Sequence, residues 1–247
     1  MNNNARHKNV LENRALNIVG IITARGGSVR LPRKNLRRLS GKPLITYMIK
    51  AARKSKYLKR VIVSTDHPGI KKVSLQCGAE VPFKRPKNIS GNCSSILVVQ
   101  HAVRFLEKEE KRRIDIAVTL QPTAPFCQSE DIDLCIELLL KNKNMQSAFS
   151  AVEIHQRPEW MFKLKNGKYG ELYISGRIKG ARGTKQRLPK LVMPNGAVYV
   201  TRREALFGES VIISKKTGIY EMPKERSVDI DEESDLRYAE FLLSKLK

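Results

Sequence analysis

The feature that most constrains the fold is a repeated alternation of β-branched apolar runs with amphipathic segments. Ile18 to Thr23 is a continuous apolar run, and such a run is typical of a strand buried on both faces. Segments with helical periodicity separate it from the later runs "RVIVSTD", "AEVPF", "IDIAVTL" and "QSAFSAVEI". Because strand–helix alternation favours right-handed crossovers between parallel strands, we predict an α/β fold. Its mostly parallel open sheet should carry helices on both faces.

The pattern changes after about Glu153. The stretch "MFKLKNGKYGELYI" carries an Asn166-Gly167 turn signal between alternating runs, which predicts a β-hairpin. The following "SGRIKGARGTKQRLPK" is glycine-rich and cationic, as in an arm or lid, and "NGAVYV" then resumes a buried strand. The chain therefore divides into a polar tail at residues 1–16, a main α/β domain formed by 17–154 and 190–247, and a small β-rich arm at 155–189.

Composition narrows the functional classes. A hydrophobic content of 41% with 29% charged residues is that of a globular protein rather than a disordered one. The net charge of +23 predicts an anionic partner, either nucleic acid, a membrane surface or a phosphate- or carboxylate-bearing substrate, although a lysine-rich proteome would also explain it. No run reaches the roughly 18 apolar residues of a membrane span, and the first residues do not form a secretory signal. Four cysteines without a CxxC pair argue against zinc and favour a cytoplasmic setting.

The loop "ARGGSVRLPRKN" follows directly after the first strand. Loops at the carboxyl ends of parallel strands bind ligands, and "STDHPG" and "QPTAP" fall at the same edge. Gly26 and Gly27 allow positive φ and let backbone N–H groups come close to a phosphate. Arg25, Arg33 and Lys34 would add positive charge. The loop is not a P-loop, and a solvated basic turn is the alternative.

A second group of polar residues lies in "SVDIDEESD". Asp229 and Asp231 alternate, so in an extended segment both face one way, as two ligands of Mg²⁺ would. The alternative is the acidic first turn of a C-terminal helix, which we predict over Glu232 to Leu246. Asp66 would either orient the glycine loop or cap the next helix.

Seven motifs in order resemble the acylneuraminate (sialic acid) cytidylyltransferase family of CMP-sugar synthetases. These motifs are "ARGGSVRLPRKN", "GKPLI", "VIVSTD", "GAEVPFKRP", "LQPTAP", "KQRLPKLVMPNGAVYV" and "SVDIDEESD". The resemblance implies a nucleotide-diphospho-sugar transferase-like fold. It also implies transfer of CMP from CTP to a nonulosonic, sialic-acid-like sugar acid, with Mg²⁺ as cofactor and pyrophosphate as the second product. Family members are homodimers in which a small arm reaches over the partner's site.

The resemblance assigns roles residue by residue. Arg25, Lys34 and Asp231 are the implied catalytic group, and Asp229 with Asp231 are the implied Mg²⁺ ligands. The implied nucleotide-binding residues are Arg25, Gly26, Gly27, Ser28, Asn35 and Arg85, and the implied sugar-binding residues are Gln121, Lys185, Gln186, Asn195 and Tyr199.

Three departures from the family pattern concern the same loops. The first motif has Val29 followed by Arg30 where the family has lysine, so Arg30 would either take over that charge or leave it weakened. "QPTAPFC" replaces the family's "QPTSPLR" at Ala124 and Cys127, and the arm motif begins with Lys185 instead of arginine. Other acceptors are therefore open, namely the eight-carbon Kdo or a diamino nonulosonate such as legionaminic or pseudaminic acid. A nucleic-acid-binding protein that reuses the fold is a further alternative, which the aromatic content of 6% disfavours.

Overall fold

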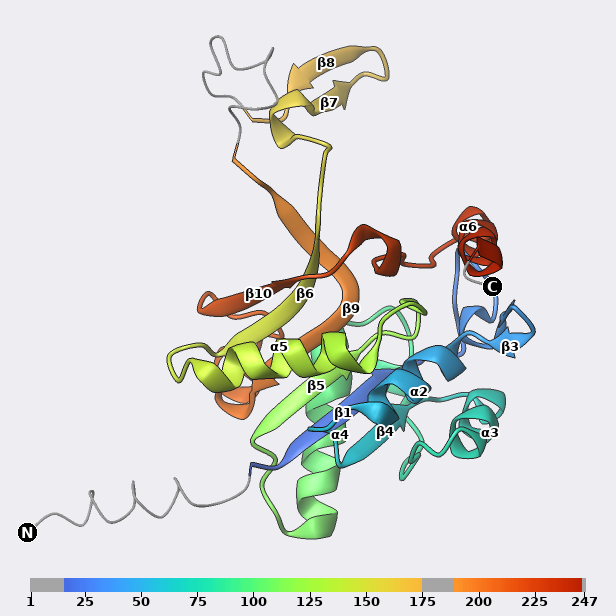
Figure 1. The fold of residues 1–247 in the computed structure, drawn as a ribbon, viewed down its shortest axis with the longest axis vertical. Helices are drawn as coiled ribbons and strands as arrows, with labels where there is room; N and C mark the ends of the chain where they lie inside the picture. The colour runs from blue at the N-terminus through green and yellow to red at the C-terminus, as the bar shows by residue number, and fades with distance from the viewer. Residues whose placement is uncertain (1–15, 175–188, 246–247) are drawn as a thin grey trace, which may run out of the picture.

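The computed structural model describes residues 16–174 and 189–245. Its body is a six-stranded sheet with the strand order β10-β6-β9-β5-β1-β4 (Figure 1). β1 pairs in parallel with β4 and β5, β10 pairs in parallel with β6, and β9 runs antiparallel to both β5 and β6. The predicted mostly parallel open sheet is confirmed. The strands are β1 (Ile18–Thr23), β4 (Arg60–Ser64), β5 (Ile116–Leu120), β6 (Ser147–Glu153), β9 (Val192–Arg202) and β10 (Thr217–Glu221).

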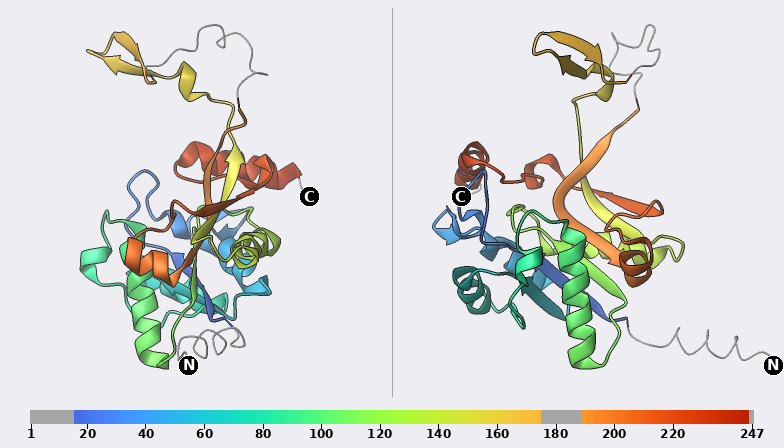
Figure 2. Two further views of the ribbon diagram at one scale, coloured as in Figure 1. Left: turned by 90° about the vertical axis from the view of Figure 1, so that its left-hand side faces the viewer. Right: turned by 180° about the vertical axis from the view of Figure 1, so that it is seen from behind.

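Helices cover both faces of this sheet, as predicted (Figures 1 and 2). One apolar cluster joins α2, α3 and α5 to the sheet, and a second joins α4 and a short π-helix (Ala205–Glu209) to the opposite face. α6 packs near the small β2–β3 ladder at the end of the sheet. The bounds are β2 (Arg38–Leu39), β3 (Lys42–Pro43), α2 (Ile45–Lys54), α3 (Pro68–Gln76), α4 (Ser95–Glu110), α5 (Ser129–Lys141) and α6 (Glu233–Lys245).

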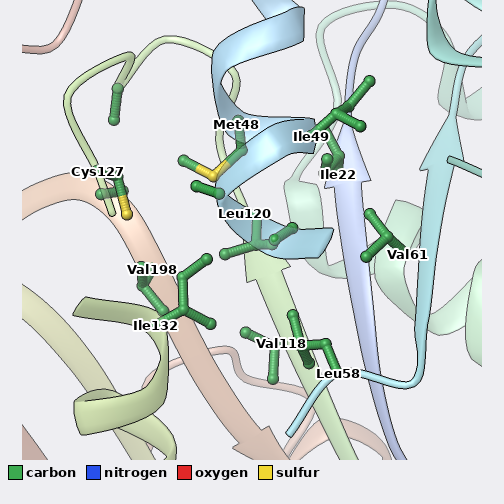
Figure 3. Packing of buried hydrophobic residues seen from close by; sticks show 14 of the residues in the cluster. Ile22, Met48, Ile49, Leu58, Val61, Val118, Leu120, Cys127, Ile132 and Val198 are labelled. Atoms are coloured by element: carbon green, nitrogen blue, oxygen red, sulfur yellow. The ribbon is translucent and has the colours of Figure 1, made fainter. Parts of the chain in front are cut away.

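β1 shows why an unbroken apolar run is needed at the centre. Its side chains alternate, so Ile18 and Ile22 enter the first cluster while Val19 and Ile21 enter the second. Figure 3 shows Ile22 among Met48 and Ile49 of α2 and neighbouring strand residues. Both faces are therefore dry, and β1 is held in the middle of the sheet with its end pointing toward the loops.

One predicted strand is wrong. "AEVPF" contributes only an isolated parallel bridge between Ile62 and Glu80, in which Glu80 bonds to Val61 and Val63. Pro82 has no N–H to continue that ladder, and the chain leaves the edge of the sheet there. The sequence pattern did not predict β10 or the β2–β3 ladder, because each is short and half exposed.

The arm is built on the long strands β6 and β9, which extend away from the body (Figure 1). It holds the antiparallel pair β7 (Phe162–Lys165) and β8 (Tyr169–Leu172). Asn166 at φ 50° and Gly167 at φ 69° form the turn, which confirms the predicted hairpin. The predicted tail lies almost wholly outside the described residues, as does part of the arm. Among the described helices, none is long and apolar enough to span a membrane.

Candidate active site

The candidate site is a pocket at the carboxyl edge of the sheet. The loops after β1 and β5 form its walls, and the segment before α6 closes one side. Ile230 N–H donates to the Thr123 carbonyl at 2.8 Å, which ties that segment to the loop after β5. The pocket has a volume of about 190 Å³ and is lined by Thr23, Arg25, Ser28, Val29, Arg30, Leu31, Lys34, Asn35, Gln121, Pro122, Thr123 and Asp231.

The glycine loop is shaped by close packing. A Cβ on Gly26 would lie 2.8 Å from the His67 ring, so only glycine fits there. The Gly26 N–H donates to Asp66 Oδ1 at 2.8 Å, while His67 Nδ1 caps α3. Asp66 therefore orients the loop, and the alternative role as a cap belongs to its neighbour. Gly26 and Gly27 both have negative φ or extended backbone, and Arg33 is the loop residue that takes positive φ, at 54°.

Two cations from this loop converge on one carboxylate. Lys34 Nζ donates to Asp231 Oδ1 at 2.7 Å, and Arg30 forms a second ion pair with Asp231. Partial burial favours a higher pKa of Asp231, but the hydrogen bond and charge of Lys34, together with Arg30, lower that pKa overall. Lys34 is mostly buried at 16% side-chain exposure, whereas Arg30 is 66% exposed. Asp231 thus stays ionised between a mostly buried cation and an exposed one.

Asp229 differs from Asp231 in forming no ion pair with Lys34, whose charge acts on Asp229 only from a distance. Desolvation raises its pKa, a hydrogen bond with Thr123 opposes that shift, and the charge of Asp231 raises the pKa further. Among the described residues it forms no ion pair. Two neighbouring carboxylates offer the oxygen ligands that Mg²⁺ takes, although Asp231 lines the pocket and Asp229 is not among its lining residues. The residues present therefore fit that ion.

A second pocket adjoins the first and shares Thr23, Arg25 and Gln121 with it. Arg85 lies in its wall and is only 4% exposed. Its guanidinium donates to the hydroxyl and carbonyl oxygens of Ser64, and desolvation lowers its pKa. Of these residues, Arg25 also donates to the Gly91 carbonyl at 2.8 Å. A buried arginine without a hydrogen-bonded carboxylate is a donor held ready for a polar ligand.

Asn35 lines the first pocket, and its amide bonds to Arg25, which lines both pockets. Asn35 donates to the Arg25 carbonyl at 2.9 Å, whereas its own Oδ1 is buried without a hydrogen-bond partner. A buried acceptor left unpaired costs about 1–3 kcal/mol, so it is suited to accept from a bound molecule. The sequence analysis placed Asn35 and Arg85 on the same ligand, and the structure brings both to this double pocket.

The residues expected to bind the sugar lie in different environments. Gln121 lines both pockets and accepts from the Thr23 hydroxyl at 3.2 Å. Asn195 is buried, and its amide bonds to Ser150 at 2.6 Å and Ser227 at 2.9 Å, so this side chain fastens β9 to its neighbours. Tyr199 stacks on Phe149 with ring centroids 6.5 Å apart. Lys185 and Gln186 lie outside the described residues.

The structure also places the residues that depart from the family pattern. Val29 is 86% exposed on the rim of the pocket, while Arg30 next to it reaches Asp231. Ala124 and Cys127 are buried in the core beside α5, and burial raises the pKa of the Cys127 thiol. Neither Ala124 nor Cys127 is among the residues that line the two pockets.

The sequence analysis did not identify one ion pair that frames the site. Arg226, in the segment leading to Asp229, donates to the buried Asp131 with its Nη2 at 2.7 Å and its Nε at 3.2 Å. Tyr220 adds a third hydrogen bond to Asp131 at 3.0 Å. An Asp at the third position of α5 is visible in the sequence, but its burial is not. Its arginine partner is 95 residues away, so the sequence pattern does not indicate the pair.

Comparisons with known proteins agree with this geometry. Residues 19–242 match the family model described as "Cytidylyltransferase". The chain belongs to the cytidylyltransferase family. It is 33% identical to a pseudaminic acid cytidylyltransferase of Campylobacter jejuni, over 90% of this chain and 94% of that protein. It is 31% identical to a CMP-N,N'-diacetyllegionaminic acid synthase of the same species, over 92% and 95% respectively.

Solved structures show the same fold. A CMP:2-keto-3-deoxy-manno-octonic acid synthetase complexed with CTP aligns with a TM-score of 0.66, at 19% identity, over 94% of this cytidylyltransferase and 100% of that chain. At this identity the likeness establishes the architecture alone.

Proposed function

We propose that this cytidylyltransferase activates a nonulosonic, sialic-acid-like sugar acid by transferring CMP to it from CTP, with release of pyrophosphate. The observation that supports this most directly is the double pocket, in which Arg25 stands between a cationic compartment and the compartment of Arg85. Relatives named for pseudaminic and diacetyllegionaminic acids support an acceptor of that class.

The residues suit the charges of such a reaction. The sugar's anomeric hydroxyl attacks the α-phosphorus of CTP, the bond from that phosphorus to its bridging oxygen breaks, and the hydroxyl proton passes to solvent. Arg25 and Lys34 bind the triphosphate and offset the negative charge that grows on the leaving pyrophosphate. Gly26 and Gly27 let the loop backbone approach the phosphates. Asn35 and Arg85 orient the cytidine.

We assign the cofactor role to Mg²⁺, held by Asp229 and Asp231. The ion would supply positive charge to the triphosphate oxygens. Binding it requires Asp231 to exchange partners, since Lys34 and Arg30 occupy that carboxylate in the present arrangement. Those two cations would then be released toward the phosphates.

We also assign a homodimeric assembly and a cytoplasmic location. The support for the dimer is the β7–β8 hairpin, where Phe162, Leu164 and Tyr169 are 61%, 71% and 70% exposed. A two-stranded hairpin is marginally stable alone, and exposed apolar patches mark interfaces. Light scattering should give a dimer mass, and Phe162→Ser with Leu164→Ser should shift it toward the monomer.

The activity is tested by pyrophosphate release from CTP and Mg²⁺ with a panel of acceptors. We expect release with one or more nonulosonic acids, among them pseudaminic, legionaminic and N-acetylneuraminic acids. Release with Kdo alone would reassign the acceptor. No release with any sugar acid, from protein that binds CTP in calorimetry, would contradict the proposed reaction.

A further inference from the structure

The distribution of charge along the chain is uneven in a way that the active site does not explain. Between Ala24 and Leu106 there are 19 lysines and arginines but only two acidic residues, Asp66 and Glu80. From Glu107 onward there are 25 basic and 21 acidic residues. A lysine-rich composition would raise the basic content everywhere, but it would not remove acidic residues from one third of the chain. The depletion therefore calls for a local cause.

Part of this charge serves the two pockets, and another part is neutralised by ion pairs. What is left includes six exposed lysines that form no ion pair with any residue that the structure describes. We name them the basic flank: Lys42 on β3, Lys50 and Lys54 on α2, Lys71 and Lys72 on α3, and Lys84. None of the six lines either pocket of the candidate site.

These lysines belong to elements that pack together. α2 contacts α3, and the Arg53 side chain of α2 lies against Gly78, just after α3, where a Cβ would collide with the guanidinium. Lys71 and Lys84 line one shared hollow beside β4. Figure 1 shows β3, α2 and α3 along one side of the molecule, and Figure 2 shows the same side from behind, away from the arm. The elements that carry the basic flank thus lie on one side of the body.

The chemistry of the flank indicates what it can bind. Throughout Ala24 to Leu106, which the structure describes in full, no aromatic side chain is among the exposed large hydrophobic residues. The flank therefore offers no exposed ring on which a nucleobase could stack, and Leu75 on α3 is its one large apolar residue with high exposure. Lysine acts as a point charge rather than as a bidentate reader of base edges. Such a surface suits a broad array of phosphates whose charge alone is recognised.

We propose that the basic flank holds this enzyme reversibly on an anionic phospholipid surface. Each lysine near such a surface favours binding by about fivefold, and salt screens this attraction. The contact would be peripheral, without insertion, and it would leave the pocket edge and the arm free to bind substrates and a second subunit.

The test uses flotation of the full-length protein with vesicles of phosphatidylcholine, with or without phosphatidylglycerol. We expect binding only to the anionic vesicles, and its loss when the salt concentration is raised. The variant Lys50→Glu/Lys54→Glu/Lys71→Glu/Lys72→Glu should lower the partition coefficient by at least about a hundredfold. It should turn over CTP in vesicle-free solution like the wild type.

A matched variant separates a surface effect from net charge. Lys108→Glu/Lys111→Glu/Lys215→Glu/Lys216→Glu changes the charge equally at exposed positions outside the flank. Equal losses in the two variants, or no binding of the wild type to anionic vesicles, would overturn the proposal. Tighter binding to a 30-base-pair DNA duplex than to the vesicles at the same salt would overturn it in favour of nucleic acid. Because turnover is measured separately, these outcomes do not depend on the proposed reaction.

Discussion

Asp131 and Asp231 are both paired with arginine, but Asp131 stabilises the fold whereas Asp231 lies in the candidate site. Asp131 is fully buried and receives Arg226, Tyr220 and a backbone N–H, so its geometry is fixed from every side. Asp231 is 35% exposed, and its partners Arg30 and Lys34 line an open pocket. The buried pair cannot be exchanged without leaving a charge in the core, whereas the exposed pairs can be exchanged for a ligand at little cost. The structural Asp131 pair and the Asp231 pairs of the candidate site therefore differ in burial and not in residue type.

The largest effect should come from Asp231→Ala. The variant should lower Mg²⁺-dependent turnover about a thousandfold, because a lost metal ligand forfeits several kcal/mol of charge stabilisation. Its melting temperature should change little. Glu232→Ala, at the next position, is the matched control and should turn over normally. Normal turnover by the Asp231 variant would refute the metal assignment.

Arg226→Met should have the next largest effect, this time on folding. It leaves buried Asp131 without its cation, and we expect the free energy of unfolding in urea to fall by about 3 kcal/mol. The comparison is Arg203→Met, which removes an equally bidentate pair from Glu107, a residue with 17% side-chain exposure. The Arg203 variant should lose less. Equal losses would show that burial does not distinguish the two pairs.

Arg30 tests whether an exposed partner of Asp231 also contributes to nucleotide binding. Arg30→Gln should raise KM for CTP about tenfold and change the unfolding free energy by less than about 0.5 kcal/mol. Adding Val29→Lys returns a cation to the neighbouring rim position and should restore most of the affinity. If the double variant binds CTP as weakly as Arg30→Gln, the two positions are not interchangeable.

The smallest effect concerns the pH dependence of stability. Because the pKa of Asp231 is lowered in the folded protein, its ion pairs stabilise the fold above the ordinary carboxyl pKa and lose this effect as pH falls through the lowered value. Wild type and Asp231→Asn should therefore differ by less than about 1 kcal/mol near neutral pH and converge in acid below about pH 4. Urea unfolding across that range measures the difference. A gap that widens in acid would contradict the sign of the shift.

The sequence by itself determined the repeated strand–helix order, the hairpin at Asn166-Gly167 and the edge where the loops meet. Each of these follows from local periodicity or from the turn chemistry of adjacent residues. The edge-strand error at "AEVPF" arose because strand propensity does not count available ladder partners. Local sequence likewise gave no signal for the positive φ of Arg33, because the surrounding loop imposes that conformation.

Only the tertiary structure decided which charges meet. Arg30 and Asp231 are 201 residues apart in sequence, and Arg226 and Asp131 are 95 apart. Hydrophobic periodicity in the sequence cannot predict such ion pairs. They depend on how β9 reverses direction and on how the segment before α6 returns across the loop after β5. The same is true of the hydrogen bonds that join the Asn195 amide to Ser150 and Ser227. Local sequence sets the elements, and packing sets their partners, because pairing energies depend on distance in space and on exposure to water.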